Sequence, residues 1–512
     1  MVGRAVPSGV DRDRRGRSDR RELPRTGARM TGSTGRPGTW LAWTRTLPLE
    51  GDAEAIFAAL HGPDGGTAVW LDSAQQAYGM GRWSIIGAPE GPRDHVVEFW
   101  AADGRVRIDG ADAGAGIDLW ELLAERLDAN PVDAPSDLPF AGGYVGAIGY
   151  GVKDIGARRP TREPDAQLVH LSRYVVVDHV DGVVQVVATG PASDEADARS
   201  WIAATAQRLG ELAPLAPLAP PLAPPSAGAA EASVTRARYR RDLDAVRSWL
   251  LAGDSYEACY TYTLRCPVDD APFEAYRRLR RANPAPYASY LRLPGRTILS
   301  CSPERYLTVS RSGWAETKPI KGTARRLADP AADRAAAAAL AADPKTRSEN
   351  LMIVDLLRND LGRISAPGTV DVPQLMAVET YATVHQLVTS VRARLLPRPA
   401  GGVRAAGALF PPGSMTGAPK RRTVELLDAL EAEPRGVYAG VIGAFSRCGA
   451  VDLSVVIRTA VVADGVARIG TGGAITIDSD PAAEADETVA KSAAMLRAFG
   501  CTHPFEDGQS RA

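Results

Sequence analysis

The sequence predicts an α+β fold with large sheets, and three observations favour it. Residues 40–212 contain short runs in which apolar and polar side chains alternate, as they do in strands. A proline-rich segment follows, and proline cannot enter the interior of a sheet. Beyond this segment, helix and strand patterns succeed one another irregularly, unlike the regular alternation of a parallel α/β fold.

Composition limits the classes of protein that the chain can belong to. Its 512 residues suffice for two lobes or one large mixed domain, and 45% hydrophobic residues allow a sizeable core. The formal net charge of −1 argues against nucleic-acid or membrane binding, and no apolar run of 18 residues predicts a spanning helix. Five scattered cysteines without a C-x-x-C pair predict neither disulfides nor a zinc site, and they favour a reducing, cytoplasmic compartment.

The first 38 residues are predicted to be a disordered basic tail. Residues 1–29 hold nine arginines against four acidic residues, and they lack the apolar stretch of a secretory signal. The four acidic residues also disfavour an organellar transit peptide. Met30 is an alternative start of the chain.

Alternating runs at residues 67–72 and 174–178 predict strands, and residues 118–127 have the apolar spacing of a helix. The proline- and alanine-rich stretch that follows is typical of an extended linker. The predicted organisation is an N-terminal lobe (residues 39–212), a linker (213–233) and a C-terminal lobe (234–506).

The C-terminal lobe alternates helices and strands. Residues 239–252 form a periodic helical pattern that ends before Gly253, a favourable residue after a helix C-terminus. One predicted strand is apolar throughout, as in a strand buried on both faces. The further expected helices are residues 335–342, 349–361 and 484–499, and the expected strands are residues 288–293, 296–301 and 453–462, the last being the apolar one.

Three charged residues share one face of the terminal helix. Glu484, Glu487 and Lys491 are spaced i, i+3 and i+7. A magnesium ion takes one or two carboxylates and completes its coordination with water and an anionic substrate. The alternative is an ordinary solvated charged face.

Glu349 and Arg458 occupy positions where charge is unexpected. Glu349 opens an apolar helix, where it either complements the helix dipole or provides a second metal carboxylate facing Glu487. Arg458 lies within the apolar run at 453–462, so it needs a buried partner: either an internal carboxylate or the carboxylate of a substrate.

Lys321 lies between a proline-containing approach and Gly322, which permits close approach of a second backbone or a ligand. To act as a nucleophile it must be neutral, so its pKa must fall from about 10.4 toward about 7–8. The alternative is an exposed lysine on a turn.

Residues 413–420 combine glycines with a following helix, as in an anion-binding turn, but they do not form a Walker A loop.

Together these segments resemble the chorismate-utilising enzyme family, which includes the synthase components for anthranilate and for 4-amino-4-deoxychorismate. The resemblance is strong from about residue 236 to 500 and weaker in the N-terminal lobe. It implies the fold of anthranilate synthase component I, in which large antiparallel sheets pack as a sandwich with helices outside. The segments that carry it are residues 302–306, 319–323, 349–361, 413–420, 438–443 with 456–459, and 472–474 with 484–491.

The resemblance also implies roles for individual residues. Glu349 and Glu487, with Glu484 beside them, match ligands of a Mg²⁺ ion that holds the ring carboxylate of chorismate. Asp72 and Ser73 lie in the part of the family that can hold tryptophan. Tyr438 and Arg458, with backbone amides around Gly472 and Gly473, match positions that bind the enolpyruvyl carboxylate of the substrate. His385 and Ser414 match positions beside the substrate ring, and Lys491 matches a basic residue near the metal.

Two positions indicate which member of the family is most similar. Lys321 matches the lysine of the aminodeoxychorismate enzymes, whereas anthranilate synthases usually have alanine there. Isochorismate and salicylate synthases carry a base lysine where this chain has Glu257, so addition of water is disfavoured. The implied activity is that of an aminating transferase: Lys321 attacks C2 of chorismate, Glu304 protonates the C4 hydroxyl, and ammonia then displaces the lysine at C4.

No segment resembles a glutamine amidotransferase, so the resemblance implies a separate glutaminase subunit that supplies ammonia for para-aminobenzoate, in folate or secondary metabolism. The nearest alternative is an anthranilate synthase component, which aminates C2 and eliminates pyruvate. A second alternative is a non-catalytic regulator that binds chorismate or tryptophan.

Overall fold

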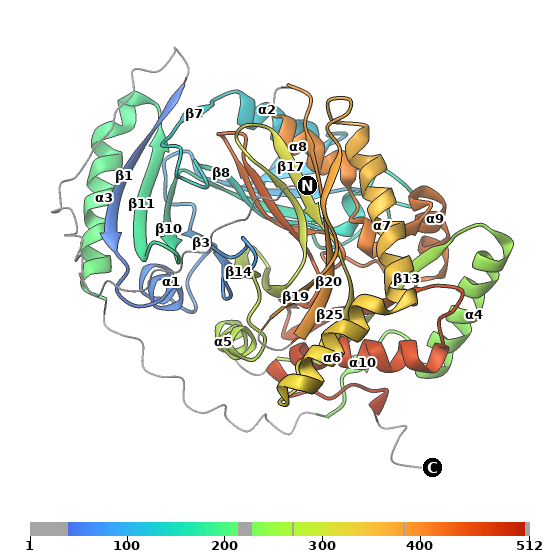
Figure 1. The fold of residues 1–512 in the computed structure, drawn as a ribbon. Helices are drawn as coiled ribbons and strands as arrows, with labels where there is room; N and C mark the ends of the chain where they lie inside the picture. Colours follow the sequence, from blue (N-terminus) through green and yellow to red (C-terminus); the bar gives the residue numbers. More distant parts are fainter. Residues whose placement is uncertain (1–38, 213–227, 269–270, 382–383, 399, 507–512) are drawn as a thin grey trace, which may run out of the picture.

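The computed structural model describes residues 39–212, 228–268, 271–381, 384–398 and 400–506. The predicted basic tail at residues 1–38 lies outside the described residues, and so do residues 213–227 of the predicted linker. Two large sheets form the centre of the molecule (Figure 1).

Sheet 1 contains thirteen strands and sheet 2 contains twelve. Sheet 1 runs in the order β12 (Glu231–Ala232), β13 (Glu257–Pro267), β25 (Val466–Ile475), β24 (Thr459–Ala463), β15 (Arg296–Ser302), β14 (Tyr287–Leu293), β2 (Ala68–Asp72), β3 (Trp83–Gly87), β10 (Arg173–Asp178), β11 (Val183–Gly190), β1 (Trp40–Pro48) and β7 (Val132–Asp133), with β21 (Gly417–Ala418) beside β13. Sheet 2 runs β18 (Ile320–Arg325), β20 (Val384–Arg394), β17 (Trp314–Lys318), β16 (Arg305–Val309), β23 (Val451–Val455), β22 (Val441–Ser446), β8 (Gly143–Ile148), β9 (Ala166–Leu171), β4 (Val96–Trp100), β5 (Arg105–Ile108) and β6 (Ala111–Gly114), with β19 (Asp371–Thr380) beside β20.

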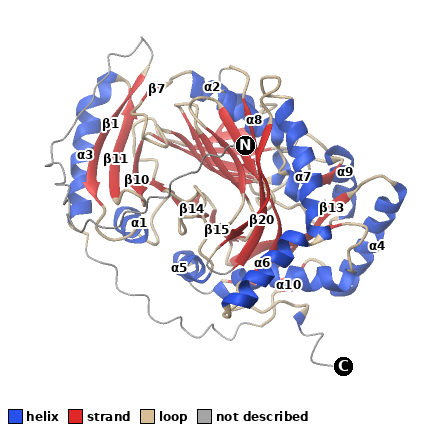
Figure 2. Ribbon diagram, in the orientation of Figure 1, coloured by secondary structure: helices blue, strands red, loops and turns tan. Residues whose placement is uncertain are grey.

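Helices lie outside the two sheets (Figure 2). They are α1 (Ala53–His61), α2 (Leu119–Asp128), α3 (Glu195–Gly210), α4 (Arg236–Ala252), α5 (Pro272–Ala282), α6 (Pro330–Ala342), α7 (Pro344–Gly362), α8 (Gly401–Leu409), α9 (Lys420–Leu430) and α10 (Pro481–Ala498), with 3-10 turns η1 (Tyr150–Val152), η2 (Ala192–Asp194) and η3 (Gly413–Met415).

Three hydrophobic clusters account for this layering. One joins sheet 1 to α1, α3, α4, α5 and α10, and a second joins sheet 2 to α2, α7 and α8. The third combines apolar side chains from both sheets, such as Val69 and Leu291 of sheet 1 with Val145 and Val169 of sheet 2. The predicted α+β sandwich with outer helices is therefore confirmed.

Both sheets draw strands from both sides of the proline-rich segment. In sheet 1, β2 pairs with β14, and in sheet 2, β8 pairs with β22. The last residues of the predicted linker themselves form β12. The boundary proposed from composition is thus not a boundary between sheets.

Most predicted elements of the C-terminal lobe lie where the sequence places them, and Gly253 ends α4 in the left-handed conformation, with φ 76°. The prediction of a single buried strand at residues 453–462 is wrong. The chain forms β23 in sheet 2, breaks at Arg458 and continues as β24 in sheet 1. A strand that is buried on both faces is apolar throughout, whichever sheet it belongs to. The apolar pattern therefore could not show that the chain changes from one sheet to the other.

The helix predicted to begin at Glu349 begins earlier. Asp343 caps α7 by accepting a hydrogen bond from the Thr346 backbone amide, and Pro344 follows as the first helical residue. Glu349 therefore lies in the second turn, and complementing the helix dipole does not explain its position.

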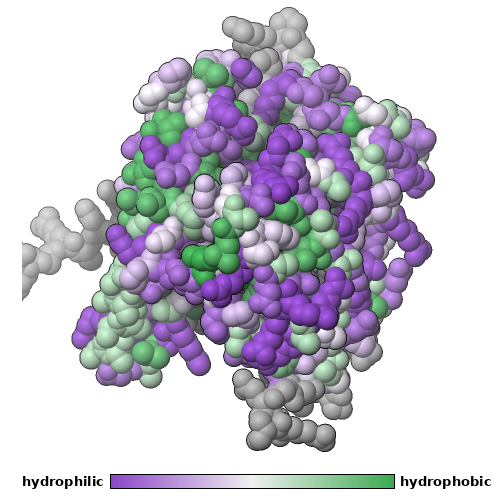
Figure 3. Space-filling model, turned by 90° about the vertical axis from the view of Figure 1, so that its right-hand side faces the viewer, coloured by the Kyte–Doolittle hydropathy of each residue, from purple (hydrophilic) through white to green (hydrophobic). Residues whose placement is uncertain are grey.

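Figure 3 shows the side of the molecule that carries α4, α7 and α9. Hydrophilic residues dominate this face, and the hydrophobic residues on it form small separate patches. None of the helices within the described ranges combines the length and apolar content needed to cross a bilayer.

His503 is expected to make the fold sensitive to acid. It is fully buried; its Nδ1 accepts a hydrogen bond from the Phe505 amide, and its Nε2 lies 3.1 Å from the Tyr262 hydroxyl. Burial, and then the charge of Arg236, lowers the pKa of His503 to about 4 from 6.5. The unfolded chain therefore binds more protons between these values, so this stabilisation is complete above pH 6.5 and is lost as the pH falls toward 4.

We expect the free energy of unfolding to fall by about 2 kcal/mol between pH 7 and pH 5 through this residue. Denaturant unfolding of the wild type and of His503→Asn at both pH values measures this loss. Asparagine can still accept the Phe505 hydrogen bond but does not titrate, so its pH dependence should be smaller by that amount. Identical pH dependence in the two proteins would contradict the assignment.

Candidate active site

The chain passes from one sheet to the other at two adjacent places. It leaves β15 of sheet 1 at Ser302 and enters β16 of sheet 2 at Arg305, and it returns from β23 to β24 through Arg458. The two crossings are hydrogen-bonded: the Val455 amide donates to the Glu304 carbonyl (3.0 Å), and the Cys301 amide donates to the Arg458 carbonyl (3.0 Å). The resemblance motifs containing Glu304 and Arg458 therefore meet in space.

Glu304 is a buried carboxyl group at the first crossing. Burial raises its pKa to about 7, although a hydrogen bond from Ser414, the charge of Lys321 and the Ile320 amide each lower it. A carboxyl group with a pKa near 7 can both donate and accept a proton at neutral pH. Ser414, expected beside a substrate ring, thus contacts the expected acid.

Lys321 lies on β18, at an irregularity in its pairing with β20 between Ile320 and Thr323. Its neighbour Gly322 has φ 87°, and a Cβ there would lie 2.3 Å from the Thr346 side chain of α7. Close packing at Gly322 is therefore observed, but it is made by side chains of α7 and α6 rather than by a second backbone or a ligand. The Lys321 side chain is buried, so the alternative of an exposed lysine on a turn is wrong.

The Lys321 ammonium forms an ion pair with the Glu257 carboxylate of β13. This contact joins sheet 2 to sheet 1. Burial lowers the pKa of Lys321, but the charges of Glu257 and Glu349 and the Glu257 hydrogen bond outweigh it and raise the pKa above its usual value. The expectation of a lowered pKa is therefore wrong for this state of the molecule, because buried carboxylates surround the amine.

Carboxylates of α7 and α10 come together beside this pair, with two further lysines. The Lys345 ammonium lies 3.1 Å from Glu484 and 3.8 Å from Glu349. Lys491 lies 2.8 Å from Glu487. Lys345 thus bridges Glu349 to Glu484 of α10, whereas Glu487, the residue that Glu349 was expected to face, pairs with Lys491.

This acidic cluster favours a cation. Burial, and the like charges of Glu257 and Glu484, raise the pKa of Glu349 to about 7 although Lys321 and Lys345 lower it. The described residues contain no group of three metal-ligating side chains in position around one point. Magnesium needs only one or two carboxylates, however, and Lys345 already bridges two of them as a cation would. Glu349 and Glu484 therefore fit a shared cation, while Glu487 pairs with Lys491 and is half-exposed.

Arg458 occupies the second crossing with φ 50°, a left-handed conformation that is unusual for arginine. Burial lowers its pKa, while the neighbouring Tyr438, Cys301 and Glu487 raise it. No carboxylate among the described residues forms an ion pair with its guanidinium. The internal salt bridge that the sequence left open is therefore not formed among the described residues, although the charge of Glu487 acts on Arg458.

Three glycines of β25 make room for these groups. A Cβ at Gly470 would lie within the Tyr438 ring, at 2.1 Å, and a Cβ at Gly473 would lie 3.1 Å from Glu484 Oε2. Lys491 donates a hydrogen bond of 3.3 Å to the Gly472 carbonyl. Pairing of β24 with β25 stops at Ile469, so the glycine-containing end of β25 pairs with β13 alone.

Other expected residues have internal partners. His385 Nε2 lies 3.0 Å from Asp333 and Nδ1 lies 2.8 Å from Thr380, so both ring nitrogens are engaged. The Asp72 carboxylate accepts hydrogen bonds from Arg280 (2.8 Å) and from a tyrosine of α5, and Ser73 donates to a backbone carbonyl. A ligand at Asp72 would have to replace these contacts.

The segment at residues 413–420 has a second use that the sequence did not reveal. It places β21 against β13, with the Tyr256 amide donating to Ala418 and the Cys259 amide donating to Thr416. A Cβ at Gly417 would lie 2.0 Å from the Glu257 carbonyl. The glycine is therefore required for close backbone approach at Glu257.

The sequence did not reveal two residues that form ion pairs with the candidate site residues. Lys345 had no motif to mark it, although its spacing of four residues before Glu349 was a signal for a pair on one helix face. From the sequence, Glu257 was noted only as the position at which isochorismate and salicylate synthases carry a base lysine. Its contact with Lys321 joins residues 64 positions apart.

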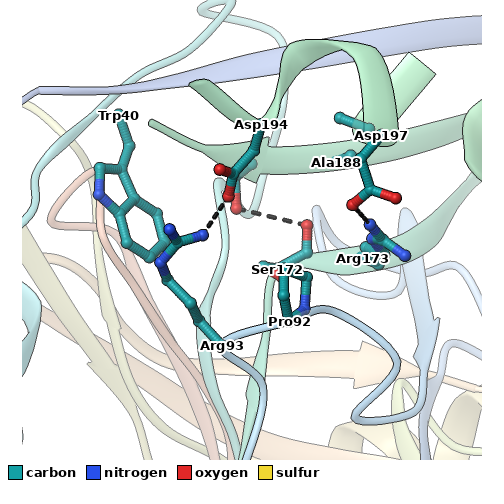
Figure 4. A pocket seen from close by; sticks show the side chains of 10 residues that line it. Trp40, Pro92, Arg93, Ser172, Arg173, Ala188, Asp194 and Asp197 are labelled. Atoms are coloured by element: carbon teal, nitrogen blue, oxygen red, sulfur yellow. Dashed lines mark hydrogen bonds and ion pairs between the residues drawn. The ribbon is translucent and has the colours of Figure 1, made fainter. Parts of the chain in front are cut away.

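A separate pocket lies beside β10 and β11, between Trp40, Arg93 and Ser172 (Figure 4). Its charged side chains pair with each other: Arg93 with Asp194, and Arg173 with Asp197. These pairs leave it less suited to bind a polar ligand than the cluster around Lys321.

The site at the sheet crossings thus combines a buried amine, a carboxyl group that can exchange a proton near pH 7, two carboxylates bridged by Lys345, and a half-buried arginine without a carboxylate partner among the described residues. Such an arrangement can bind an anionic substrate, polarise it and support nucleophilic substitution.

Comparison with known proteins places these features in a family. Residues 79–497 match the family model described as chorismate binding enzyme. The chain is 43% identical over 483 residues to an aminodeoxychorismate synthase of Streptomyces pristinaespiralis, covering 91% of this chain and 66% of that protein. It is 39% identical over 402 residues to aminodeoxychorismate synthase component 1 of Salmonella typhimurium, covering 76% and 83% respectively.

The structure of anthranilate synthase component I from Streptococcus pneumoniae superposes with a TM-score of 0.70 at 28% identity, covering 82% of this chain and 93% of that one. The expected fold is thereby confirmed. The chain spans slightly less than two thirds of the length of the Streptomyces relative. With the family model matching most of its length, the chain belongs to the family of chorismate binding enzymes.

Proposed function

We propose that the protein aminates chorismate at C4, forming 4-amino-4-deoxychorismate from chorismate and ammonia. The observation that carries this proposal is the position of Lys321, a buried amine close enough to Glu304 for its charge to lower the pKa of that carboxyl group. The names of the Streptomyces and Salmonella relatives support the same reaction.

The reaction proceeds by two displacements. Neutral Lys321 attacks C2 of the ring, the double bond shifts, and the C4 hydroxyl leaves as water with a proton from Glu304. Ammonia then attacks C4, the bond between C2 and Lys321 breaks, and Glu304 accepts a proton from the new amine. Two displacements preserve the configuration at C4, and Glu304 ends in its starting protonation state.

Binding residues surround this chemistry. Arg458 pairs with the enolpyruvyl carboxylate, with the Tyr438 hydroxyl and the backbone near Gly472 and Gly473 beside it. Glu349, Glu484 and Glu487 would hold Mg²⁺, and the ion would supply Lewis-acid stabilisation of negative charge at the ring carboxylate. Lys491 lies next to these ligands and adds positive charge.

Product identification tests the proposal. The purified chain is incubated with chorismate, ammonium and magnesium, and the products are identified by mass spectrometry. Formation of 4-amino-4-deoxychorismate is expected. Anthranilate with release of pyruvate would assign the protein to the alternative reaction, which the 28% identical anthranilate synthase structure keeps open. Binding of chorismate without turnover would indicate a regulator.

We propose that ammonia comes from a separate glutamine amidotransferase subunit. The name component 1 of the Salmonella relative supports a partner subunit. Turnover by the purified chain is expected with ammonium but not with glutamine.

We also propose a reducing, cytoplasmic location, because all five cysteines are free thiols.

Removal of divalent cations is expected to lower turnover by about 10²-fold or more, since a Lewis acid at the carboxylate contributes several kcal/mol. Chelation with EDTA followed by rate measurement tests this, and added magnesium should restore the rate. Unchanged turnover after chelation would contradict the assignment of Glu349 and Glu487 as ligands.

Replacing Arg458 by lysine is expected to raise KM for chorismate by about 10–100-fold, because a charge-assisted bidentate contact contributes about 1.5–3 kcal/mol. The value of kcat should change less, as expected for an interaction made equally in substrate and transition state. Steady-state kinetics on the variant measure both. An unchanged KM would show that Arg458 does not bind the substrate.

A further inference from the structure

Glu257 is a buried carboxylate that the proposed mechanism does not yet use. Its side chain is 1% exposed. One oxygen, Oε1, accepts a hydrogen bond from Lys321, and the other, Oε2, is buried without a hydrogen-bond partner among the described residues. An unpartnered buried oxygen of this kind is unusual in a folded protein and indicates a functional role.

The backbone holds this carboxylate firmly in place. The Glu257 carbonyl accepts a hydrogen bond of 2.9 Å from the Ser255 hydroxyl, and Gly417 of β21 lies directly against it. The carboxylate begins β13 of sheet 1, whereas Lys321 belongs to sheet 2. The ion pair therefore fixes the position of the amine relative to the opposite sheet, where the glycines of β25 lie.

Several other titratable groups face the pair. Glu349 of α7 and Glu487 of α10 act on Lys321, as do Glu304 at the first sheet crossing and Cys259 on β13. Lys345 and Lys491 balance the carboxylates on the two helices. Of these groups, Glu257 is the one in hydrogen-bonding contact with the Lys321 nitrogen.

A protonated lysine has no lone pair with which to attack carbon. In the free protein the ion pair keeps Lys321 in this unreactive form, so the proton must leave after the substrate arrives. Glu257 is the acceptor already in contact. Chorismate displaces water from the site, and loss of water disfavours both charged forms, so proton transfer that turns the ion pair into a neutral amine and a neutral acid becomes more favourable.

We propose that Glu257 positions Lys321, keeps it protonated in the free enzyme and takes up its proton when chorismate binds. This inference rests on the proposed function. In this step an N–H bond of Lys321 breaks and an O–H bond forms on Glu257, with Oε2 free to hold the proton. The neutral amine then attacks C2; after ammonia displaces it, Lys321 is again a neutral amine, and the proton returns from Glu257 as product leaves.

The variant Glu257→Gln tests this assignment, because glutamine keeps the size and an acceptor oxygen but removes the charge. The full-length protein in magnesium-containing buffer is treated with cyanate, which carbamylates only neutral amines. Peptide mass spectrometry then measures modification at Lys321. Without the carboxylate, burial dominates and the neutral amine becomes more abundant, so modification should be at least about 10-fold faster in Glu257→Gln.

The pH dependence of kcat/KM for chorismate, which reports on the free enzyme, gives a second readout. Its acid limb should move to higher pH by about one unit or more in Glu257→Gln, because without the proton acceptor Lys321 must already be neutral when chorismate binds. The matched control is Glu433→Gln, which removes a half-exposed carboxylate paired with Arg265. It should alter neither measurement.

Equal carbamylation of Lys321 in wild type and Glu257→Gln, with an unmoved acid limb, would overturn the inference. That outcome leaves the proposed function intact if Lys321→Ala still abolishes amination. Conversely, if Lys321→Ala forms product normally, the proposed function fails whatever the carbamylation rates show. Thermal unfolding of each variant identifies any that is not folded.

Discussion

Replacement of Lys321 by alanine is expected to reduce formation of 4-amino-4-deoxychorismate by about 10³-fold or more, because removing a covalent nucleophile abolishes the two-displacement route. Binding of chorismate should persist, since Arg458 and the carboxylates of α7 and α10 remain. The measurement is the single-turnover rate of product formation together with the Kd for chorismate. A covalent adduct at Lys321, detected by intact-protein mass spectrometry without ammonia, should also disappear.

The alanine variant leaves Glu257 buried without its partner, which can destabilise the fold by about 3–5 kcal/mol. Lys321→Arg is therefore the matched control. Arginine preserves a cation beside Glu257 but cannot lose its proton to become a nucleophile. It should be folded and equally inactive. Amination by either variant at the wild-type rate would remove Lys321 from the mechanism.

Replacement of Glu304 by glutamine is expected to lower the rate of the first displacement by about 10²–10⁴-fold, the usual contribution of general acid catalysis. The acid form of Glu304 is required in this step. Since burial raises the pKa of Glu304 to about 7, the wild-type rate should fall as the pH rises above 7. Loss of chorismate in a single turnover without ammonia measures this step separately from the second.

Ser414→Ala provides a directional control for the same assignment. The Ser414 hydrogen bond lowers the pKa of Glu304, so its removal should move the alkaline limb of the first step to higher pH. The Glu304→Gln variant should show no such limb. A wild-type rate and pH profile in Glu304→Gln would show that another group protonates the leaving hydroxyl.

Sequence patterns predicted correctly those features that depend on residues close together in the chain, such as helix ends and helix faces. Gly253 ended α4 as expected, and the charged face of α10 was evident from the spacing of Glu484, Glu487 and Lys491. Signals failed where two structures share one pattern. The apolar run around Arg458 suited one buried strand as well as two strands in different sheets.

The site residues could be proposed from motifs, but their electrostatic state could not. A pKa depends on the charges and solvent around a group, and these come from distant segments. Lys321 was expected to be neutral because its role requires it. Its contact with Glu257 and the nearby Glu349 reverse that expectation in the free protein.

The sequence by itself determined the fold class, and it allowed Lys321 to be proposed as the nucleophile and Glu349, Glu484 and Glu487 as ligands of a cation. Only the tertiary structure decided that two sheet crossings bring Glu304 and Arg458 together, and that Glu257 pairs with Lys321 across the two sheets. The physical reason is range: helix spacing and side-chain chemistry act within a few residues, whereas burial and Coulomb interactions act between groups that only the folded chain brings near.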